Sequence, residues 1–296
     1  MPAHGFRIVN VFTFQQGTLT GNPLCVFESG AGFDAQTMQA LARQFNLSET
    51  TFILPATRPD AHARVRIFTP GYEMPFAGHP TLGSAHVCRS LNLGGDVLRL
   101  EMQAGLIAVS AQRDRWTLTA PDSSFREVEV PRAMLADALG LAERDIGERP
   151  LWVKAGKEQL IVPLSSLDAV RRAAPKPAAF GAIRSEDGIG MAYVFAERGN
   201  GQTLARFFFP SGGSMLEDPA TGSATANFGG WCLAMGRPLP LRVDIAQGEF
   251  VGRPSALYLE VAEDRQIRVS GDVVELGTGT VTLDQEPVRL MGAVTQ

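Results

Sequence analysis

Cysteine is scarce in this chain of 296 residues, which contains three cysteines, at positions 25, 88 and 232. They lie far apart, are odd in number and form no CxxC pair, so the sequence predicts neither a disulfide framework nor a zinc site. Isolated thiols of this kind are usually small buried side chains, which we expect for all three. No HExxH pattern and no acidic cluster with metal-ligand spacing occurs, so we expect no metal site.

Long apolar runs and basic stripes are also missing. No hydrophobic stretch approaches the roughly 18 residues of a membrane span, and the N-terminal residues do not resemble a secretory signal. The formal net charge is -4, and aromatic residues do not alternate with Lys or Arg. We therefore expect a cytoplasmic protein that binds neither membranes nor nucleic acid.

The common nucleotide and nucleophile motifs are absent as well. No GxGxxG follows a strand, no GxxxxGK[ST] loop occurs, and no GxSxG turn is present. The first two motifs would bind dinucleotides or phosphates, and the third would present a catalytic serine. The sequence therefore predicts no cofactor, which leaves any chemistry to ordinary side chains and backbone groups.

The patterns that are present favour strands over helices. Residues 33–46 form the clearest helical pattern, with Asp34 as the candidate N-cap and with Met38, Leu41 and Phe45 on one face. Most other segments alternate apolar and polar residues over short runs and end at glycine or proline. Because strands and helices do not alternate regularly, an α+β fold is favoured over a doubly wound α/β fold.

Several phrases occur twice along the chain. "RIFTP" at 66–70 matches "RFFFP" at 206–210, "HPTLGSA" at 79–85 matches "DPATGSA" at 218–224, and "GNPLCVF" at 21–27 resembles "GRPSALY" at 252–258. Common turn residues can match by chance, but the shared upstream strand favours a duplication. We interpret the chain as two similar halves, residues 1–120 and 121–282, with a last strand near 283–296 returning to the first half.

Each copy of the second phrase predicts the start of a helix, at His79-Pro80 and at Asp218-Pro219. Proline suits the first helical turn because it lacks an N–H that would be unpaired there, and aspartate is a good N-cap. Exposed N–H groups and the helix dipole attract anions at such a start. Two such starts facing one cleft would bind a small carboxylate between small residues, namely Gly78, Gly83, Gly222 and Ser223.

Five motifs occur in order between residue 8 and about residue 258: "LTGNPLCVF", "NLSETTF", "RIFTPGYEMPFAGHPTLGSAH", "EDPATGSA" and "QGEFVGRPS". Together they resemble the PhzF-like (phenazine biosynthesis-like) isomerase family, which shares the fold of diaminopimelate epimerase. The resemblance implies two pseudo-symmetric halves, each a strand-rich barrel around a central helix, with the active site between them. It also implies a homodimer.

The resemblance further assigns candidate roles to single residues. Glu49 matches the catalytic acid/base, and His79 and Asp218 match residues that hold the substrate and assist proton movement. The candidate substrate-binding positions are Gly78, Thr221, Gly222 and Ser223. Specificity is expected to come from loop side chains for which the sequence offers no code, such as those of Tyr72, Met74 and Met215.

Each of these residues also has a simpler interpretation. Glu49 would otherwise be a solvated loop carboxylate, and His79 a packed or solvent-facing imidazole. Asp218 would only cap its helix, and Ser223 would only keep the helix start slim.

The sequence therefore favours a cofactor-independent isomerase that transfers a proton on a small anionic metabolite, with Glu49 as the acid/base. One alternative is a non-catalytic ligand-binding or interaction protein that retains the fold. Another is a racemase or epimerase that uses carboxylates.

Overall fold

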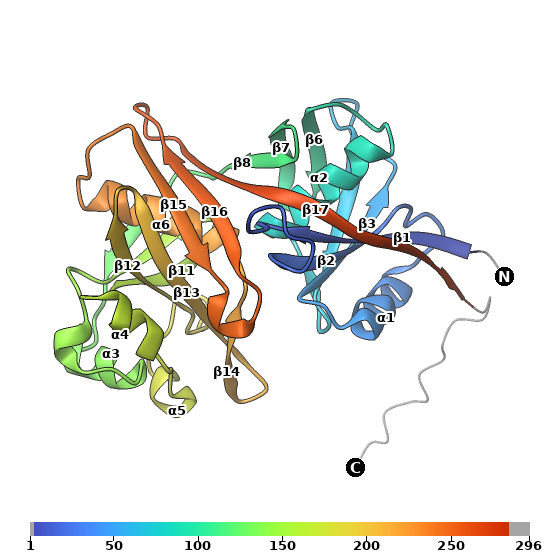
Figure 1. Ribbon diagram of the computed structural model, residues 1–296. Coiled ribbons are helices and arrows are strands. Elements are labelled where there is room, and N and C mark those ends of the chain that lie inside the picture. The colour runs from blue at the N-terminus through green and yellow to red at the C-terminus, as the bar shows by residue number, and fades with distance from the viewer. Residues whose placement is uncertain (1–2, 284–296) are drawn as a thin grey trace, which may run out of the picture.

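The computed structural model describes residues 3–283, which form two lobes side by side (Figure 1). The first lobe contains two helices, α1 (Ala35–Phe45) and α2 (Gly78–Ser90). Its strands are β1 (Ala3–Val11), β2 (Asn22–Phe27), β3 (Glu49–Leu54), β4 (Ala63–Phe68), β5 (Glu73–Met74), β6 (Val97–Met102), β7 (Gly105–Gln112) and β8 (Arg115–Thr119). The long strand β17 (Ile267–Thr282) joins the lobes.

The second lobe repeats this arrangement with additional short helices. Its strands are β9 (Ser124–Glu127), β10 (Leu151–Ala155), β11 (Lys157–Pro163), β12 (Ala192–Gly199), β13 (Gln202–Ser211), β14 (Ser214–Asp218), β15 (Leu241–Gln247) and β16 (Ser255–Val261). Its helices are α3 (Arg132–Ala138), η1 (Glu143–Asp145), α4 (Leu167–Arg172), α5 (Pro177–Phe180), α6 (Gly222–Ala234) and η2 (Glu249–Val251). The predicted α+β class is confirmed, since strands predominate and most pairings are antiparallel.

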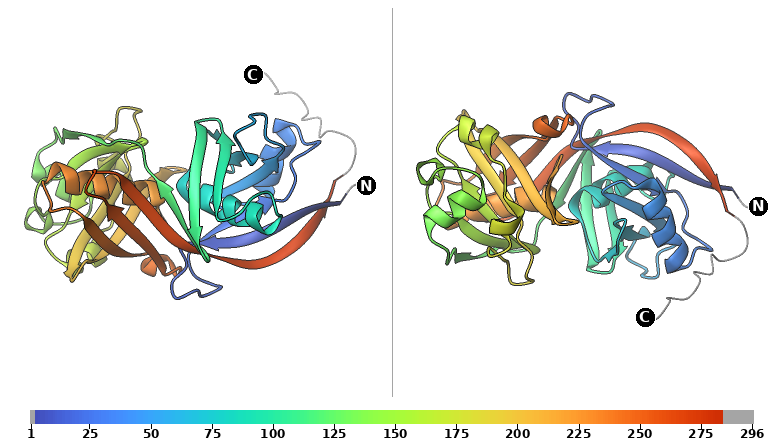
Figure 2. Two further views of the ribbon diagram at one scale, coloured as in Figure 1. Left: turned by 90° about the horizontal axis from the view of Figure 1, so that it is seen from above. Right: turned by 90° about the horizontal axis from the view of Figure 1, so that it is seen from below.

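The first lobe is a closed barrel around one helix. Its eight strands follow one another as β17-β1-β2-β3-β4-β6-β7-β8 and return to β17. Helix α2 runs through this ring and is buried over most of its length (Figure 2). At Gly83 a Cβ atom would lie only 2.6 Å from the Leu24 side chain, so a glycine allows the helix to approach the barrel wall.

The second lobe has the same strand order around α6, which makes the two lobes pseudo-symmetric. The pairings run β9-β10-β11-β12-β13-β15-β16-β17. The parallel pairs β11–β12 and β13–β15 correspond to β2–β3 and β4–β6 of the first lobe. Phe228 and Trp231 of α6 are buried in the apolar core that these strands cover.

Two extended segments cross between the lobes. The chain enters the second lobe through β8 and β9 and comes back through β17, which pairs antiparallel with β8. Residues 267–270 of β17 pair with β16, and residues 273–282 pair with β1, so this strand belongs to both rings. The last strand that we predicted near 283–296 falls almost entirely outside the described residues.

A duplicated ion pair relates the two lobes residue by residue. Arg66 of β4 contacts Glu73 at 2.7 Å, and Arg206 of β13 contacts Glu217 at 2.7 Å. Each guanidinium also lies over the ring of a phenylalanine two residues later, at 5.0 Å and 4.7 Å from the ring centre. The offset of 140 residues read from "RIFTP" and "RFFFP" therefore holds for these strands.

The predicted start of the second central helix is wrong. Helix α6 begins at Gly222 with Thr221 as its N-cap, whereas Asp218 is the last residue of β14. Strand β14 is longer than its counterpart β5, so the offset at the helix caps is 144 residues, from Ala77 to Thr221. The helix starts therefore equate Gly78 with Gly222, rather than His79 with Asp218.

The predicted first helix and the cysteines agree with the structure. Asp34 caps α1 by accepting a hydrogen bond from the backbone N–H of Thr37 at 2.7 Å, and Met38 and Leu41 are buried on the predicted face. The three cysteines are free and buried. Within residues 3–283, no helix is long and apolar enough to cross a membrane.

Candidate active site

Glu49 lies where the two lobes meet, as the first residue of β3. Its side chain is 14% exposed, so it is not the solvated loop carboxylate of the simpler interpretation. Its Oε2 atom lies 3.3 Å from Nε2 of His79, which is 7% exposed. In the described part of the chain, neither of these atoms is in hydrogen-bond geometry with any partner.

His79 occupies the first turn of α2, and its imidazole lies beside the Glu49 carboxyl group. Its imidazole forms a hydrogen bond with the backbone of Pro23, where the carbonyl is the sole polar group because proline has no N–H. The imidazole is therefore the donor, and since Nε2 is unpartnered, the donor is Nδ1. Burial lowers the pKa of His79 to about 3, so that the ring is neutral at physiological pH.

The electrostatics of Glu49 keep a proton available at neutral pH. Burial, and to a smaller extent the negative charge of Asp218, raise the pKa of Glu49 from 4.5 to about 8. The neutral Nε2 of His79, 3.3 Å away, carries no positive charge that would favour loss of this proton. A carboxyl group that titrates near neutral pH can both release and accept protons.

Asp218, which belongs to the second lobe, lies close enough to Glu49 for its charge to raise the pKa of Glu49. Its Oδ1 accepts a hydrogen bond from Asn22 Nδ2 at 2.9 Å, and its Oδ2 accepts one from the Thr221 hydroxyl at 2.5 Å. Burial raises the pKa of Asp218 to about 6, while the two hydrogen bonds oppose that rise and nearby Glu217 adds to it. Asp218 does not cap α6 through a backbone N–H.

The two central helices begin against each other. A Cβ atom on Gly78 would lie 3.7 Å from both the Gly222 Cα and the Ser223 backbone nitrogen. Neither Ala77 nor Thr221, the two N-caps, accepts a capping hydrogen bond with its side chain. The first-turn N–H groups thus stay available, and their partial positive charge favours an anion at this junction.

Sequence reasoning missed three amide side chains at the junction. Gln159 donates to Ser223 Oγ at 3.1 Å, Asn22 donates to Asp218, and Gln247 contacts both Asp218 and Thr221. Asn22 and Gln247 stand in two of the motifs quoted for the family resemblance, so the signal was present but carried no chemical assignment.

The side chains expected to set specificity are spread over the two lobes. Tyr72 is 58% exposed, and Met215 packs against the buried apolar cluster of the second lobe that contains Phe180 and Phe208. Met74 pairs with Ile67 in the β4–β5 hairpin, and Asp218 pairs with Phe207 at the equivalent place in the β13–β14 hairpin. Met74 is therefore the counterpart of Asp218.

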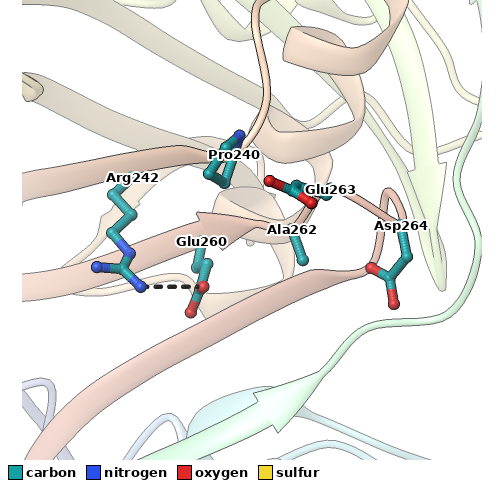
Figure 3. Close-up of a pocket in the computed structure, with 6 residues that line it drawn as sticks. All are labelled: Pro240, Arg242, Glu260, Ala262, Glu263 and Asp264. Carbon is teal, nitrogen blue, oxygen red and sulfur yellow. Dashed lines mark hydrogen bonds and ion pairs between the residues drawn. The ribbon is translucent and has the colours of Figure 1, made fainter.

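Two surface hollows lie away from these residues. One hollow of about 450 Å³ is formed by β15, β16 and the turn after β16 (Figure 3), and its lining residues are Pro240, Arg242, Glu260, Ala262, Glu263 and Asp264. A second, of about 180 Å³, lies between β13, β15 and β16 and includes Phe14 and Tyr258. Neither of these two hollows contains Glu49, His79 or Asp218.

Known proteins resemble this chain over nearly its whole length. Residues 9–279 match the family described as "Phenazine biosynthesis-like protein". An uncharacterised isomerase from Pasteurella multocida is 40% identical over 93% of this chain and 93% of its own length. Trans-2,3-dihydro-3-hydroxyanthranilate isomerase from Pseudomonas chlororaphis is 33% identical over 95% of this chain and 100% of its own length. A PhzF-family protein from Bacillus anthracis superposes with a TM-score of 0.85 at 22% identity, covering 96% of this chain and 100% of that one.

Proposed function

Since this chain belongs to the phenazine biosynthesis-like family and is an isomerase of that type, we propose that it moves a proton between two carbon atoms of a small carboxylate metabolite. The observation that carries the proposal is the buried contact of Glu49 with His79, beside two uncapped helix starts. A double bond shifts as the proton leaves one carbon and joins another, so no atom is lost and no co-reactant is consumed.

Glu49 performs the proton transfer in this proposal. Its ionised form removes a proton from the first carbon and then, as the acid, returns that proton to the second carbon. His79, whose neutral Nε2 lies 3.3 Å from Oε2, leaves the proton on Glu49 between the two steps. The raised pKa of Glu49, about 8, makes both forms accessible near neutral pH.

The helix starts bind the carboxylate of the substrate. The backbone N–H groups of Gly78, Gly222 and Ser223 supply donors, and the Ser223 hydroxyl adds another because it already accepts from Gln159. With Glu49 protonated and His79 neutral, Asp218 carries the one negative charge among these three acid/base groups. Closure of the lobes excludes water, which strengthens the electrostatic interactions.

Internal symmetry favours a one-base isomerisation over a racemisation with a base on each side. Thr50 pairs with Phe68 in the first lobe, and Ala192 pairs with the equivalent Phe208 in the second lobe. Thr50 and Ala192 are therefore equivalent, and the residue before Ala192, Met191, is the counterpart of Glu49. The acidic group on that side, Asp218, already has both oxygens engaged by hydrogen bonds. The proposed site therefore has one group free to exchange a proton with carbon.

Carboxylate recognition is tested by thermal unfolding with matched ligand pairs. The panel pairs small unsaturated acids with their amides and begins with trans-2,3-dihydro-3-hydroxyanthranilate, the compound in the name of a relative. A bound acid is expected to raise the melting temperature, since a ligand at 100 times its Kd stabilises the folded state by about 2.7 kcal/mol. Equal stabilisation by an acid and its amide would contradict recognition of the carboxylate.

A further inference from the structure

Two motifs supply residues that the proposed mechanism does not use. Asn22 comes from "GNPLCVF" in the first lobe, and Gln247 comes from "QGEFVGRPS" at the end of β15 in the second. Both side chains are almost completely buried, at 0% and 1% exposure. Both contact Asp218, although they are 196 and 29 residues away from it in the sequence.

The orientation of the Asn22 amide follows from its two partners. Its Nδ2 donates to Asp218 Oδ1 at 2.9 Å and to the Ala220 carbonyl oxygen at 3.0 Å. Because a backbone carbonyl can only accept, the NH₂ group must face this pair. Asp218 Oδ1 is therefore an acceptor.

The Gln247 amide fixes the second oxygen of Asp218 through Thr221. Its Oε1 accepts from the Thr221 backbone N–H at 3.3 Å, and its Nε2 donates to the Asp218 carbonyl at 2.9 Å and to Thr221 Oγ1 at 3.0 Å. With a backbone donor on one side and a backbone acceptor on the other, this amide fits in one orientation. Since the Thr221 hydroxyl receives a hydrogen from Gln247, its own hydrogen points to Asp218 Oδ2.

Both oxygens of Asp218 are thus acceptors, as in an ionised carboxylate. We propose that Asn22 and Gln247 are positioning residues that keep Asp218 ionised and so leave the proton of the site on Glu49. The proposal rests on the proposed function only for the role of that proton. Asn22 belongs to the first lobe and Asp218 to the second, so the full set of donors exists only when the lobes are closed.

The other titratable groups around Asp218 do not stabilise its ionised form, and the charge of Glu217 raises its pKa. Glu49 from β3 lies close enough for the charge of Asp218 to raise its pKa, and both Glu49 and its neighbour His79 are neutral near pH 7 because burial disfavours their charged forms. Glu217 precedes it in β14, and that charge is matched by Arg206 at 2.7 Å. The amide and hydroxyl donors therefore decide which of the two site carboxyls, Asp218 or Glu49, is ionised.

The test is a carbon-13 titration of the Asp218 carboxyl in the whole protein, labelled at aspartate and assigned with Asp218→Asn. Relative to wild type, Asn22→Leu and Thr221→Val should each raise the Asp218 midpoint by about one pH unit, because each removes a hydrogen bond to the ionised form. Gln247→Met should raise it by less, since the Thr221 hydroxyl then remains but is no longer oriented.

Two matched variants separate this role from a merely structural one. Thr221→Ser keeps the hydroxyl and should restore the wild-type midpoint, whereas Thr225→Val makes the same change as Thr221→Val one turn later and should leave Asp218 unaffected. The Glu49 midpoint should fall in Asn22→Leu, because a protonated Asp218 no longer repels a charge there.

An Asp218 midpoint unchanged in Asn22→Leu and Thr221→Val would overturn the positioning role. If either variant fails to fold, as judged by circular dichroism, the Thr221→Ser and Gln247→Met titrations still decide the question. This outcome is distinct from a failure of the proposed function, which is measured by the effect of Glu49→Gln on turnover.

Discussion

Turnover is expected to fall by about 10²- to 10⁴-fold when Glu49 is replaced by glutamine, the usual contribution of a positioned acid/base group. Glutamine has nearly the same shape and keeps a neutral polar group beside Nε2 of His79, which lies 3.3 Å from the carboxyl oxygen. It cannot take up or release a proton. The measurement is steady-state turnover of the acid selected by thermal unfolding, compared with wild type. Unchanged turnover would exclude Glu49 as the proton carrier.

The stability of the same variant provides its control. The ordinary pKa of a glutamate side chain is 4.5, whereas the pKa of Glu49 in the folded protein is about 8. Between these values the unfolded chain has lost the proton while the folded chain keeps it, so the wild-type free energy of unfolding declines as pH rises. The glutamine variant lacks this decline and should be the more stable protein at pH 8. Lost activity together with gained stability would rule out misfolding as the cause.

Gly248→Ala should reduce the free energy of unfolding by about 2–5 kcal/mol. Alanine is disfavoured in a left-handed backbone conformation, and its Cβ would also clash with neighbouring atoms. Gly248 has a φ of 77°, and an added Cβ would collide with the carbonyl oxygens of Arg253 and Pro219. Both carbonyls belong to the backbone, so no side chain can rotate away. Because Gly248 follows Gln247 and Pro219 follows Asp218, the variant should also disturb the Asp218 hydrogen bonds. Urea unfolding is the measurement.

Gly252→Ala is the matched control for that prediction. Gly252 closes the same short turn with a φ of 67°, but nothing lies within 4 Å of the added Cβ. It should lose about 1–2 kcal/mol, the cost of the left-handed backbone alone. Equal losses in the two variants would show that the Gly248 contacts add nothing.

Local sequence rules predicted the parts of this fold that local interactions determine. Asp34 caps α1 as its position before a helical pattern indicates. Asp218 also stands just before a predicted helix, yet it ends a strand, because Glu217 pairs with Phe208 across the hairpin and forms an ion pair with Arg206. Phe208 and Arg206 lie too far along the chain from Asp218 to be considered when a helix cap is predicted from neighbouring residues. Strand pairing therefore prevailed over the local preference for a cap.

The site was accessible from sequence only in part. The family motifs drew attention to Glu49, His79 and Asp218, and the fold brings helix starts from both lobes together. The roles of Asn22 and Gln247 depend on contacts that cross the two lobes or join distant strands. Such contacts leave no periodic pattern, and neither does the pairing of one strand, β17, with both lobes.

The most direct measurement is a carbon-13 titration of the Glu49 carboxyl in the wild-type protein, labelled at glutamate and assigned by the signal lost in Glu49→Gln. In the proposed mechanism, this buried group keeps its proton at neutral pH and exchanges it during catalysis. We therefore expect a Glu49 midpoint of about 8, above that of Asp218 at about 6. A Glu49 midpoint near 4.5, with the carboxyl already ionised at pH 6, would contradict it.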